Sequence, residues 1–140
     1  MTTIVYRDGV LASDSQCQAS RSRQPGSLTK IWRIKGRLVA GCGKSTHIER
    51  FRKWVETGMR GQAPDMGDES SGIVIEPDGR VREFEECGEI TTLTAPFYAW
   101  GTGMPAALGA LYMGATAERA VEVAMLVDIN SGGPVQSLKL

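Results

Sequence analysis

The sequence is short of the residues that most metal and redox sites require. It contains one histidine, His47, and three cysteines, Cys17, Cys42 and Cys87, and the cysteines are widely spaced with no C-x-x-C pair. Structural zinc sites take their ligands from clusters of such residues, and disulfide frameworks use cysteines in even numbers. We therefore expect no zinc site, no disulfide framework and no metal cluster of cysteine and histidine ligands.

Long apolar runs and an excess of charge of either sign are also missing. No apolar run approaches the roughly 20 residues that span a bilayer, and the N-terminus lacks the charged and apolar regions of a signal peptide. Sixteen Lys and Arg residues balance sixteen Asp and Glu residues, so no overall field favours nucleic acid or an anionic membrane. We expect a cytoplasmic protein with neither nucleic acid nor membrane as a partner.

The residues that are present suffice for one compact domain. Hydrophobic residues make up 41% of the 140-residue chain, which is enough for a layered core in a domain of this length. The sequence shows no internal repeat and no low-complexity tract. We expect a single domain over residues 1–140.

Turn residues between short β-type segments predict three hairpins. Asp-Gly and similar pairs tolerate the positive φ of tight hairpin turns. Polar residues 17–29 contain a proline and a glycine and are expected to form a loop. Residues 97–101 are expected to form a short strand or the end of one, and residues 131–140 a glycine-rich turn followed by a last strand. The hairpin turns are expected at Asp8-Gly9, Lys35-Gly36 and Pro77-Asp78-Gly79.

Apolar residues at helical spacing predict three helices, over residues 45–59, 104–115 and 117–129. Thr46 and Glu49 fit a capping box at the start of the first helix, and Thr116 fits an N-cap for the third. The order of hairpins, helix, hairpin, helix pair and final strand lacks the βαβ alternation of a parallel sheet. It indicates an α+β fold, with antiparallel sheets covered by helices.

Two glycine-rich segments look like nucleotide-binding motifs but fail their requirements. GCGKST at residues 41–46 ends like a phosphate-binding loop, yet Leu38 stands where the first glycine belongs. GTGMPA at residues 101–106 matches a dinucleotide fingerprint, yet the acidic residue at the required distance, Glu122, falls in a predicted helix. Nucleotide binding is therefore not expected.

The first residues of the chain offer nucleophilic chemistry. If Met1 is removed, as is usual before a small residue, Thr2 carries both a hydroxyl and a free α-amine. The amine can accept the proton of the hydroxyl, so the residue is its own nucleophile and base. An α-amine has an ordinary pKa of about 7.7 to 8.0, so part of it is neutral near pH 7, and a nearby cation lowers that pKa further.

Five segments, in this order, resemble the proteasome β subunits and the related bacterial proteasome-like peptidase of the heat-shock-locus system. They are TTIVYRDGVLASDSQ, TKIWRIKGRLVAGCG, the AGCG that ends it, WGTGMPAALGALYMGATAERAVEVA and DINSGGPVQSL. These families are N-terminal nucleophile hydrolases, and the resemblance runs nearly end to end. It implies a four-layer αββα sandwich with two antiparallel sheets. It also implies a threonine-type endopeptidase that forms an acyl-enzyme on Thr2.

The resemblance implies roles for individual residues of the catalytic machinery. Asp14 closes the second strand and orients Lys30, which lowers the barrier to deprotonation of Thr2. The amide of Gly43 is the oxyanion-hole donor. The residues that position the α-amine are Thr102, Asp128 and Ser131.

The resemblance also implies how substrate is bound and what the chain assembles with. Gly41 lies at the floor of the specificity pocket, and Cys17 falls beside the cleft. A peptide or unfolded protein is the implied substrate, and a homo-oligomeric ring served by an ATP-driven unfoldase is the implied assembly. Between the first helix and the third hairpin the family has two long helices and this chain has one, so one helical layer is expected to be reduced.

Two other functions remain open at this point. The same nucleophile and base serve any acyl transfer, so an amidase acting on a small substrate is one alternative. The other is a catalytically silent homo-oligomeric scaffold that keeps the fold and retains Met1.

Overall fold

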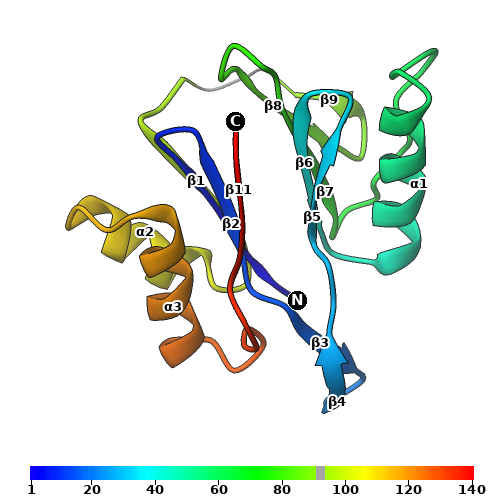
Figure 1. Cartoon of the computed structure of the whole chain (residues 1–140). Helices are drawn as coiled ribbons and strands as arrows, with labels where there is room; N and C mark the ends of the chain where they lie inside the picture. Colours follow the sequence, from blue (N-terminus) through cyan, green and yellow to red (C-terminus); the bar gives the residue numbers. More distant parts are fainter. Residues whose placement is uncertain (91–93) are drawn as a thin grey trace. The chain divides into compact units, whose positions relative to one another are not determined.

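The computed structural model describes residues 1–90 and 94–140, which contain eleven strands and three helices (Figure 1). The described chain forms two compact units, Met1–Ile31 with Ala95–Lys139, and Trp32–Thr94 with Leu140. The single domain expected over residues 1–140 stays a prediction. No helix in the described part of the chain combines the length and apolar character that crossing a bilayer demands.

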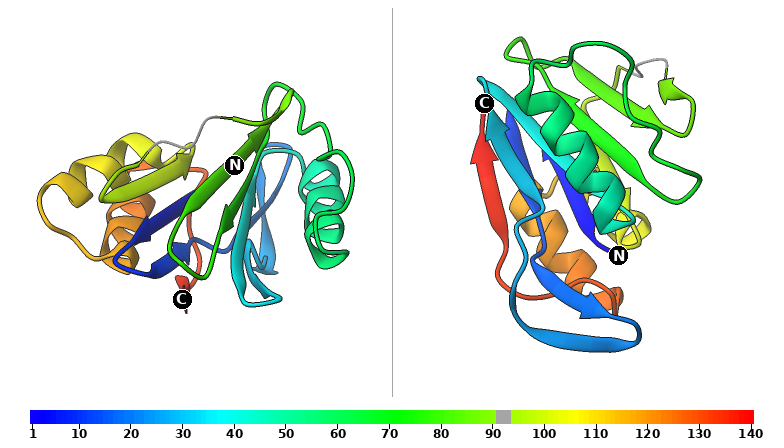
Figure 2. Two further views of the ribbon diagram at one scale, coloured as in Figure 1. Left: turned by 90° about the horizontal axis from the view of Figure 1, so that it is seen from above. Right: turned by 90° about the vertical axis from the view of Figure 1, so that its right-hand side faces the viewer.

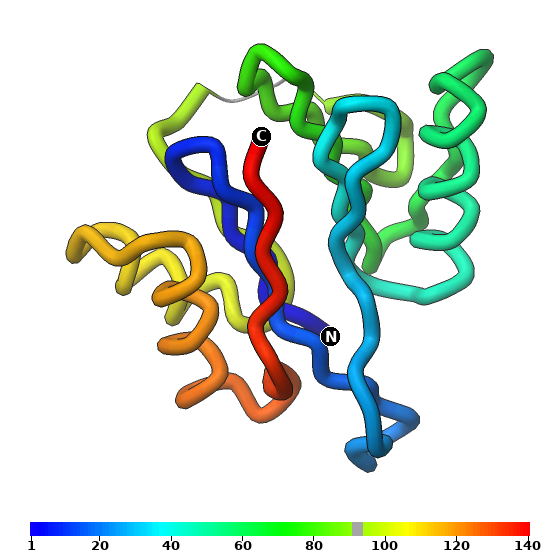
Figure 3. Tube along the Cα trace, viewed as in Figure 1, coloured from blue at the N-terminus to red at the C-terminus, as the bar shows by residue number. Residues whose placement is uncertain are grey.

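The first unit is built on an antiparallel sheet with the strand order β10-β1-β2-β11. The turn between β1 and β2 has φ values of 50° at Asp8 and 76° at Gly9, in the left-handed region that Asp-Gly tolerates, which confirms the predicted hairpin. The trace in Figure 3 shows β11 running beside β2, although the two strands are far apart in the sequence. The strands are β1 (Thr3–Arg7), β2 (Val10–Ser13), β10 (Phe97–Gly101) and β11 (Gln136–Lys139).

Two helices, α2 (Met104–Tyr112) and α3 (Ala117–Val127), cover one face of this sheet (Figure 1). Thr116 caps α3, because its side chain accepts a hydrogen bond from the Arg119 amide at 3.2 Å. Both predicted helices and this cap are confirmed. Small side chains let the helices approach each other and the sheet closely, and the fully buried core includes Val5, Ala12, Ala107, Ala120, Val121 and Ala124.

A two-stranded ribbon occupies the segment that was expected to be a loop. β3 (Gln16–Ala19) and β4 (Ser22–Ser27) pair antiparallel, and Ser20 in the turn between them has a φ of 54°. The loop prediction was wrong because every β4 side chain is exposed. Such a strand has no alternation of apolar and polar residues to mark it, and the backbone ladder is what holds it.

The second unit is built on a sheet with the strand order β5-β6-β7-β8-β9. The φ values of 49° at Lys35 and 79° at Gly36 confirm the second predicted hairpin, and β7 and β8 form the third, with Gly79 at a φ of 86°. The short strand β9 was not predicted. The strands are β5 (Ile31–Ile34), β6 (Arg37–Cys42), β7 (Ser71–Ile75), β8 (Val81–Glu85) and β9 (Gly88–Glu89).

The helix α1 (Ser45–Glu56) lies on one face of this second sheet, as both views of Figure 2 show. Lys44 is its N-cap, and no side chain caps it. The predicted capping box of Thr46 and Glu49 is therefore wrong. The helix starts directly after the turn from β6, which puts Thr46 inside the first turn, and Glu49 pairs with Arg52 at 2.7 Å instead.

A buried carboxylate in the second unit was not foreseen. Glu76 is 6% exposed, and its oxygens accept hydrogen bonds from Arg37 at 2.7 Å and Arg82 at 2.9 Å. Arg82 also binds Glu89 through two bonds of 2.7 Å. These ion pairs connect β6, the end of β7, β8 and β9, and their partial burial makes them less screened than surface pairs.

Phe51 anchors the core of the second unit. Its side chain is 1% exposed and packs against the rings of Trp54 and Phe84, at centroid distances of 5.9 and 5.3 Å. Phe51→Ala is expected to lower the free energy of unfolding by about 3–5 kcal/mol, because the change removes buried area and leaves a cavity. Urea unfolding followed by circular dichroism measures this loss.

The control is Leu126→Ala in α3, where the side chain is 82% exposed. It is expected to change the free energy of unfolding by no more than about 0.5 kcal/mol. Equal losses in the two variants would contradict the role of Phe51 as a core anchor.

Candidate active site

The carboxylate of Asp14 lies at the centre of the candidate site. Asp14 directly follows β2 and is fully buried. Its Oδ1 accepts hydrogen bonds from the Thr2 hydroxyl at 2.7 Å and from the Thr3 amide at 3.0 Å. Its Oδ2 accepts hydrogen bonds from the amides of Gln16 and Gly132, both at 3.1 Å. Each oxygen of the carboxylate therefore accepts hydrogen bonds from two of these donors, which fills its acceptor positions.

Lys30 supplies the opposite charge. It precedes β5, is 5% exposed, and places its Nζ 3.0 Å from each Asp14 oxygen. Nζ also donates to the carbonyl oxygen of Met1 at 3.3 Å. The structure thus brings together Thr2, Asp14 and Lys30, which come from three segments of the first unit. Their catalytic roles stay predictions.

A second polar cluster surrounds the carboxylate of Asp128, which ends α3. The hydroxyls of Thr102 and Ser131 both donate to Asp128 Oδ2 at 2.7 Å. Ser131 Oγ is also 2.7 Å from the Thr3 hydroxyl, and Thr102 Oγ1 lies 3.4 Å from the Thr2 carbonyl oxygen. The cluster therefore reaches the first residues through the Thr3 side chain and the Thr2 backbone. Sequence reasoning missed Thr3, although its place beside Thr2 was a signal.

The hydrogen bonds to Asp128 decide its protonation. Partial burial by itself raises the pKa of this carboxyl, but the hydrogen bonds from Thr102, Ser131 and Asn130 favour the charged form and outweigh it. The net result is a pKa below the ordinary value of 3.8. Asp128 is consequently an anion over the physiological pH range, and both hydroxyls point their protons at it.

Two glycines explain how the turn from β10 to α2 fits against the N-terminal residues. Gly101 has a φ of 91°, and a Cβ there would run into the Thr2 carbonyl oxygen. A Cβ on Gly103 would overlap the Thr3 hydroxyl. The GTG segment is therefore glycine-rich because its backbone packs directly on the Thr2 carbonyl and on the Thr3 side chain. This contact holds Thr102 beside Thr2.

The remaining predicted residues lie elsewhere. Cys17 is half-buried on β3 in the first unit. Gly41 and Gly43 belong to the second unit, at the end of β6 and in the turn that follows. A Cβ on Gly41 would lie 2.8 Å from the Ile48 side chain, so this glycine gives room to α1. The substrate-binding roles of Cys17 and Gly41 and the oxyanion role of Gly43 stay predictions.

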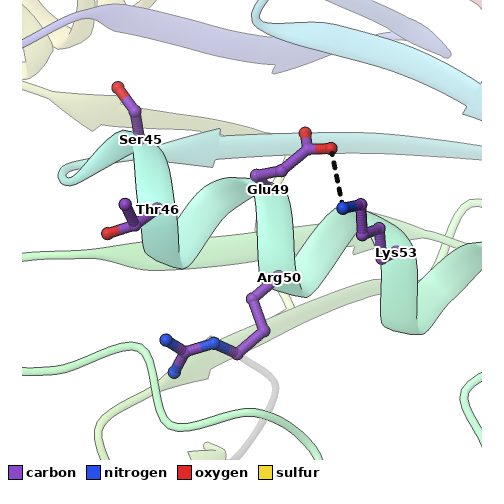
Figure 4. Close-up of a pocket in the computed structure, with 5 residues that line it drawn as sticks. All are labelled: Ser45, Thr46, Glu49, Arg50 and Lys53. Atoms are coloured by element: carbon purple, nitrogen blue, oxygen red, sulfur yellow. Dashed lines mark ion pairs between the residues drawn. The ribbon is translucent and has the colours of Figure 1, made fainter.

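Other parts of the described chain offer weaker chemistry. A shallow pocket on α1 is lined by Ser45, Thr46, Glu49, Arg50 and Lys53, and Figure 4 shows Glu49 paired with Lys53, at 3.8 Å. None of the predicted site residues lines it. Burial raises the pKa of the Cys42 thiol, which disfavours the reactive thiolate. Within residues 1–90 and 94–140, no group of three or more His, Cys, Asp or Glu side chains is arranged to hold a metal ion.

Comparison with known proteins finds relatives in structure alone. No protein-family model matches the chain, and no curated protein matches it either. Solved structures that match include BPH from Thiobacillus denitrificans, with a TM-score of 0.67, 21% identity, and 99% of this chain and 96% of that chain covered. The same protein in complex with epoxomicin matches with a TM-score of 0.66 and 21% identity, over 99% of this chain and 97% of that chain. Eukaryotic HslV from Trypanosoma brucei matches with a TM-score of 0.66 and 18% identity, covering 99% of both chains.

These matches fix the fold. The chain shares its fold with BPH and HslV, and the predicted α+β sandwich class is confirmed. The sheet of the second unit carries one helix, α1, among the residues described.

The buried charge pair generates a stability prediction. Asp14→Asn is expected to lower the free energy of unfolding by about 3 kcal/mol, because it leaves the buried Lys30 ammonium facing a neutral amide. Asp8→Asn is the matched control, since that side chain is 84% exposed and Asn also tolerates its positive φ. Urea unfolding of both variants tests this. Equal unfolding free energies of the two variants would contradict the prediction that the buried Asp14 carboxylate stabilises the fold.

The lowered pKa of Asp128 generates a pH prediction. A carboxyl whose pKa is lower in the folded state contributes stability that is fully present above its ordinary pKa of 3.8 and is lost as the pH falls towards the folded-state value. The difference in unfolding free energy between the unsubstituted protein and Asp128→Asn is therefore expected to be constant down to about pH 5 and to shrink below it. Chemical unfolding across a pH series measures it, and a difference that stays constant to about pH 3 would contradict the assignment.

Proposed function

We propose that the chain is a threonine-type endopeptidase whose nucleophile is Thr2, exposed when Met1 is removed. The observation that carries the proposal is the geometry of one buried cluster. The Thr2 hydroxyl lies 2.7 Å from Asp14 Oδ1, and Lys30 Nζ lies 3.0 Å from the same oxygen. The fold shared with HslV and with BPH, which has been solved in complex with epoxomicin, supports the same function.

The proposed reaction follows from the groups on Thr2. Its free α-amine takes the proton of its hydroxyl, and the hydroxyl oxygen attacks the carbonyl carbon of the scissile peptide bond. The amide of Gly43 donates a hydrogen bond to the resulting oxyanion. The leaving amine takes the proton from the α-amine, which leaves an ester on Thr2. Water, deprotonated by the same α-amine, then attacks the ester carbonyl, and the α-amine returns that proton to the Thr2 oxygen as the ester bond breaks and the carboxylic acid product leaves.

Lys30 and Asp14 assist without forming bonds to the substrate. The Lys30 ammonium stabilises negative charge that develops on the Thr2 oxygen and favours the neutral form of the α-amine. Asp14 holds Lys30 in place through two bonds of 3.0 Å. Thr102, whose hydroxyl lies 3.4 Å from the Thr2 carbonyl oxygen, orients the N-terminal residue together with Asp128 and Ser131.

Met1 makes the longer chain a latent form. While Met1 is attached, the nitrogen of Thr2 is an amide that cannot act as a base, and Thr2 is only 3% exposed. The carbonyl oxygen of Met1 also accepts a hydrogen bond from Lys30 Nζ, at 3.3 Å. Removing Met1 therefore turns the Thr2 nitrogen into a free α-amine that can act as the base. It also uncovers the Thr2 hydroxyl and frees one N–H of Lys30 Nζ.

The proposal extends to substrate and assembly. We infer a cytoplasmic enzyme of one domain that cleaves peptides or unfolded proteins, with Gly41 at the pocket floor and Cys17 beside the cleft. We also infer a homo-oligomer that receives substrate from an ATP-driven unfoldase. No metal or organic cofactor takes part in the proposed steps.

Cleavage of fluorogenic peptides and of unfolded casein by the purified protein tests the function. Intact mass is measured on the same preparation, and a mass short by one methionine residue is expected. Thr2→Ala is expected to lower turnover by at least about a thousandfold, because it removes the nucleophile. A threonine-directed epoxyketone is expected to label Thr2 in the unsubstituted protein.

Thr46→Ala is the control, because that threonine is exposed on α1 and should leave turnover unchanged. Turnover that survives Thr2→Ala would contradict the nucleophile. A retained Met1 with no labelling would instead support the silent scaffold. Hydrolysis of small amides without cleavage of peptides or casein would support the amidase.

A further inference from the structure

The turn that carries Gly43 is fastened to one short segment of the second unit, Glu69–Ser71. On one side of the turn, Cys42 pairs with Ser71 in the ladder between β6 and β7. On the other side, the Lys44 amide donates a hydrogen bond to Ser70 Oγ at 2.9 Å. Two neighbouring residues, Ser70 and Ser71, thus hold the peptides on both sides of Gly43.

Gly43 and Ser70 are also in tight contact. Gly43 has a φ of 108°, and a Cβ there would collide with Ser70 Oγ and with the Glu69 carbonyl oxygen. Any larger residue at this position would therefore push the turn off Ser70. Glycine has the widest backbone freedom of all residues, so the direction of its amide depends on restraints from outside the turn.

The hydroxyl of Ser70 is itself restrained. Ser70 is 5% exposed, and its Oγ lies 3.4 Å from His47 Nδ1 in the first turn of α1. A serine hydroxyl can accept from one group and donate to another, so it can accept from the Lys44 amide while donating to the imidazole. The imidazole in turn packs on Gly67, where a Cβ would lie 2.9 Å from its Cε1. The hydroxyl is thereby held between a backbone amide and a half-buried ring.

We propose that Ser70 is a positioning residue of the peptidase: its hydroxyl holds the Lys44 amide on one side of Gly43 while the β6–β7 ladder holds Cys42 on the other, and the two restraints together direct the Gly43 amide at the oxyanion. This inference rests on the proposed function, because that function assigns the oxyanion to Gly43. Donors that are preorganised stabilise a transition state more than donors that must reorient. Ser70 never touches the substrate, and it acts through the geometry of the turn. His47 supports Ser70 through the contact between its Nδ1 and the Ser70 hydroxyl.

Steady-state hydrolysis of a fluorogenic peptide by Ser70→Ala tests this role. Loss of the hydroxyl is expected to lower kcat by about tenfold while KM changes by less than about twofold, since the turn stabilises the transition state and leaves ground-state binding intact. Amide hydrogen exchange in the same variant is expected to be at least about tenfold faster at Lys44, which loses its acceptor. Circular dichroism verifies that the variant is folded.

Ser45→Ala is the matched control, because this serine follows Lys44, is exposed and should leave both readouts unchanged. Ser70→Cys keeps the shape of the side chain but offers a weaker hydrogen-bond acceptor. It replaces Ser70→Ala in the test if that variant does not fold, and a several-fold lower kcat is then expected. A kcat in the folded Ser70 variant equal to that of Ser45→Ala overturns the positioning role alone. Absence of turnover in the unsubstituted, Met1-free protein overturns the proposed function and this role with it.

Discussion

A carboxylate that is fully buried must have its charge and its oxygens satisfied from within the fold, and Asp14 imposes this constraint on the first unit. Its partners come from the start of β1, the start of β3, the residue before β5 and the turn before β11. None of these four segments can move without leaving a buried charge or amide unpaired. The ion pair between Asp14 and Lys30 therefore fixes the relative positions of these segments. The Thr2 hydroxyl is held in the same way, because it donates to the same carboxylate.

The features that followed from local chemistry were the ones that sequence reasoning could predict. Asp8-Gly9 and Lys35-Gly36 adopt left-handed turns because few other residues do so cheaply, and Thr116 caps α3 because its side chain replaces a missing backbone partner. Asp14 and Lys30 were predicted from a resemblance carried by short segments. That resemblance could place them at the ends of strands, and the distances between them came from the structure.

Other features depend on contacts between distant residues and leave no local pattern. β4 is a strand whose side chains are all exposed, so its polar composition indicated a loop. Thr46 and Glu49 satisfied the rule for a capping box, but the connection from β6 makes Lys44 the N-cap of α1, two residues before Thr46. The buried Glu76 looked like any surface acid, because its partners Arg37 and Arg82 lie on other strands. Glycines 101 and 103 suggested a nucleotide motif, whereas their small size serves contact with residues 2 and 3.

Because a ribosome releases the chain from its N-terminus, the sheet β10-β1-β2-β11 can be completed only at the end of synthesis. Leu11 pairs with Leu138, and the Thr3 hydroxyl meets Ser131, a residue 128 positions later. Contacts that join such distant segments cannot form until the later one has been synthesised. A nascent chain that has emerged only as far as α3 already contains Thr2, Asp14 and Lys30, yet it lacks the Gly132 amide and the Ser131 hydroxyl. The surroundings of Thr2 are therefore completed late in translation, and a truncated product would carry the threonine without the site.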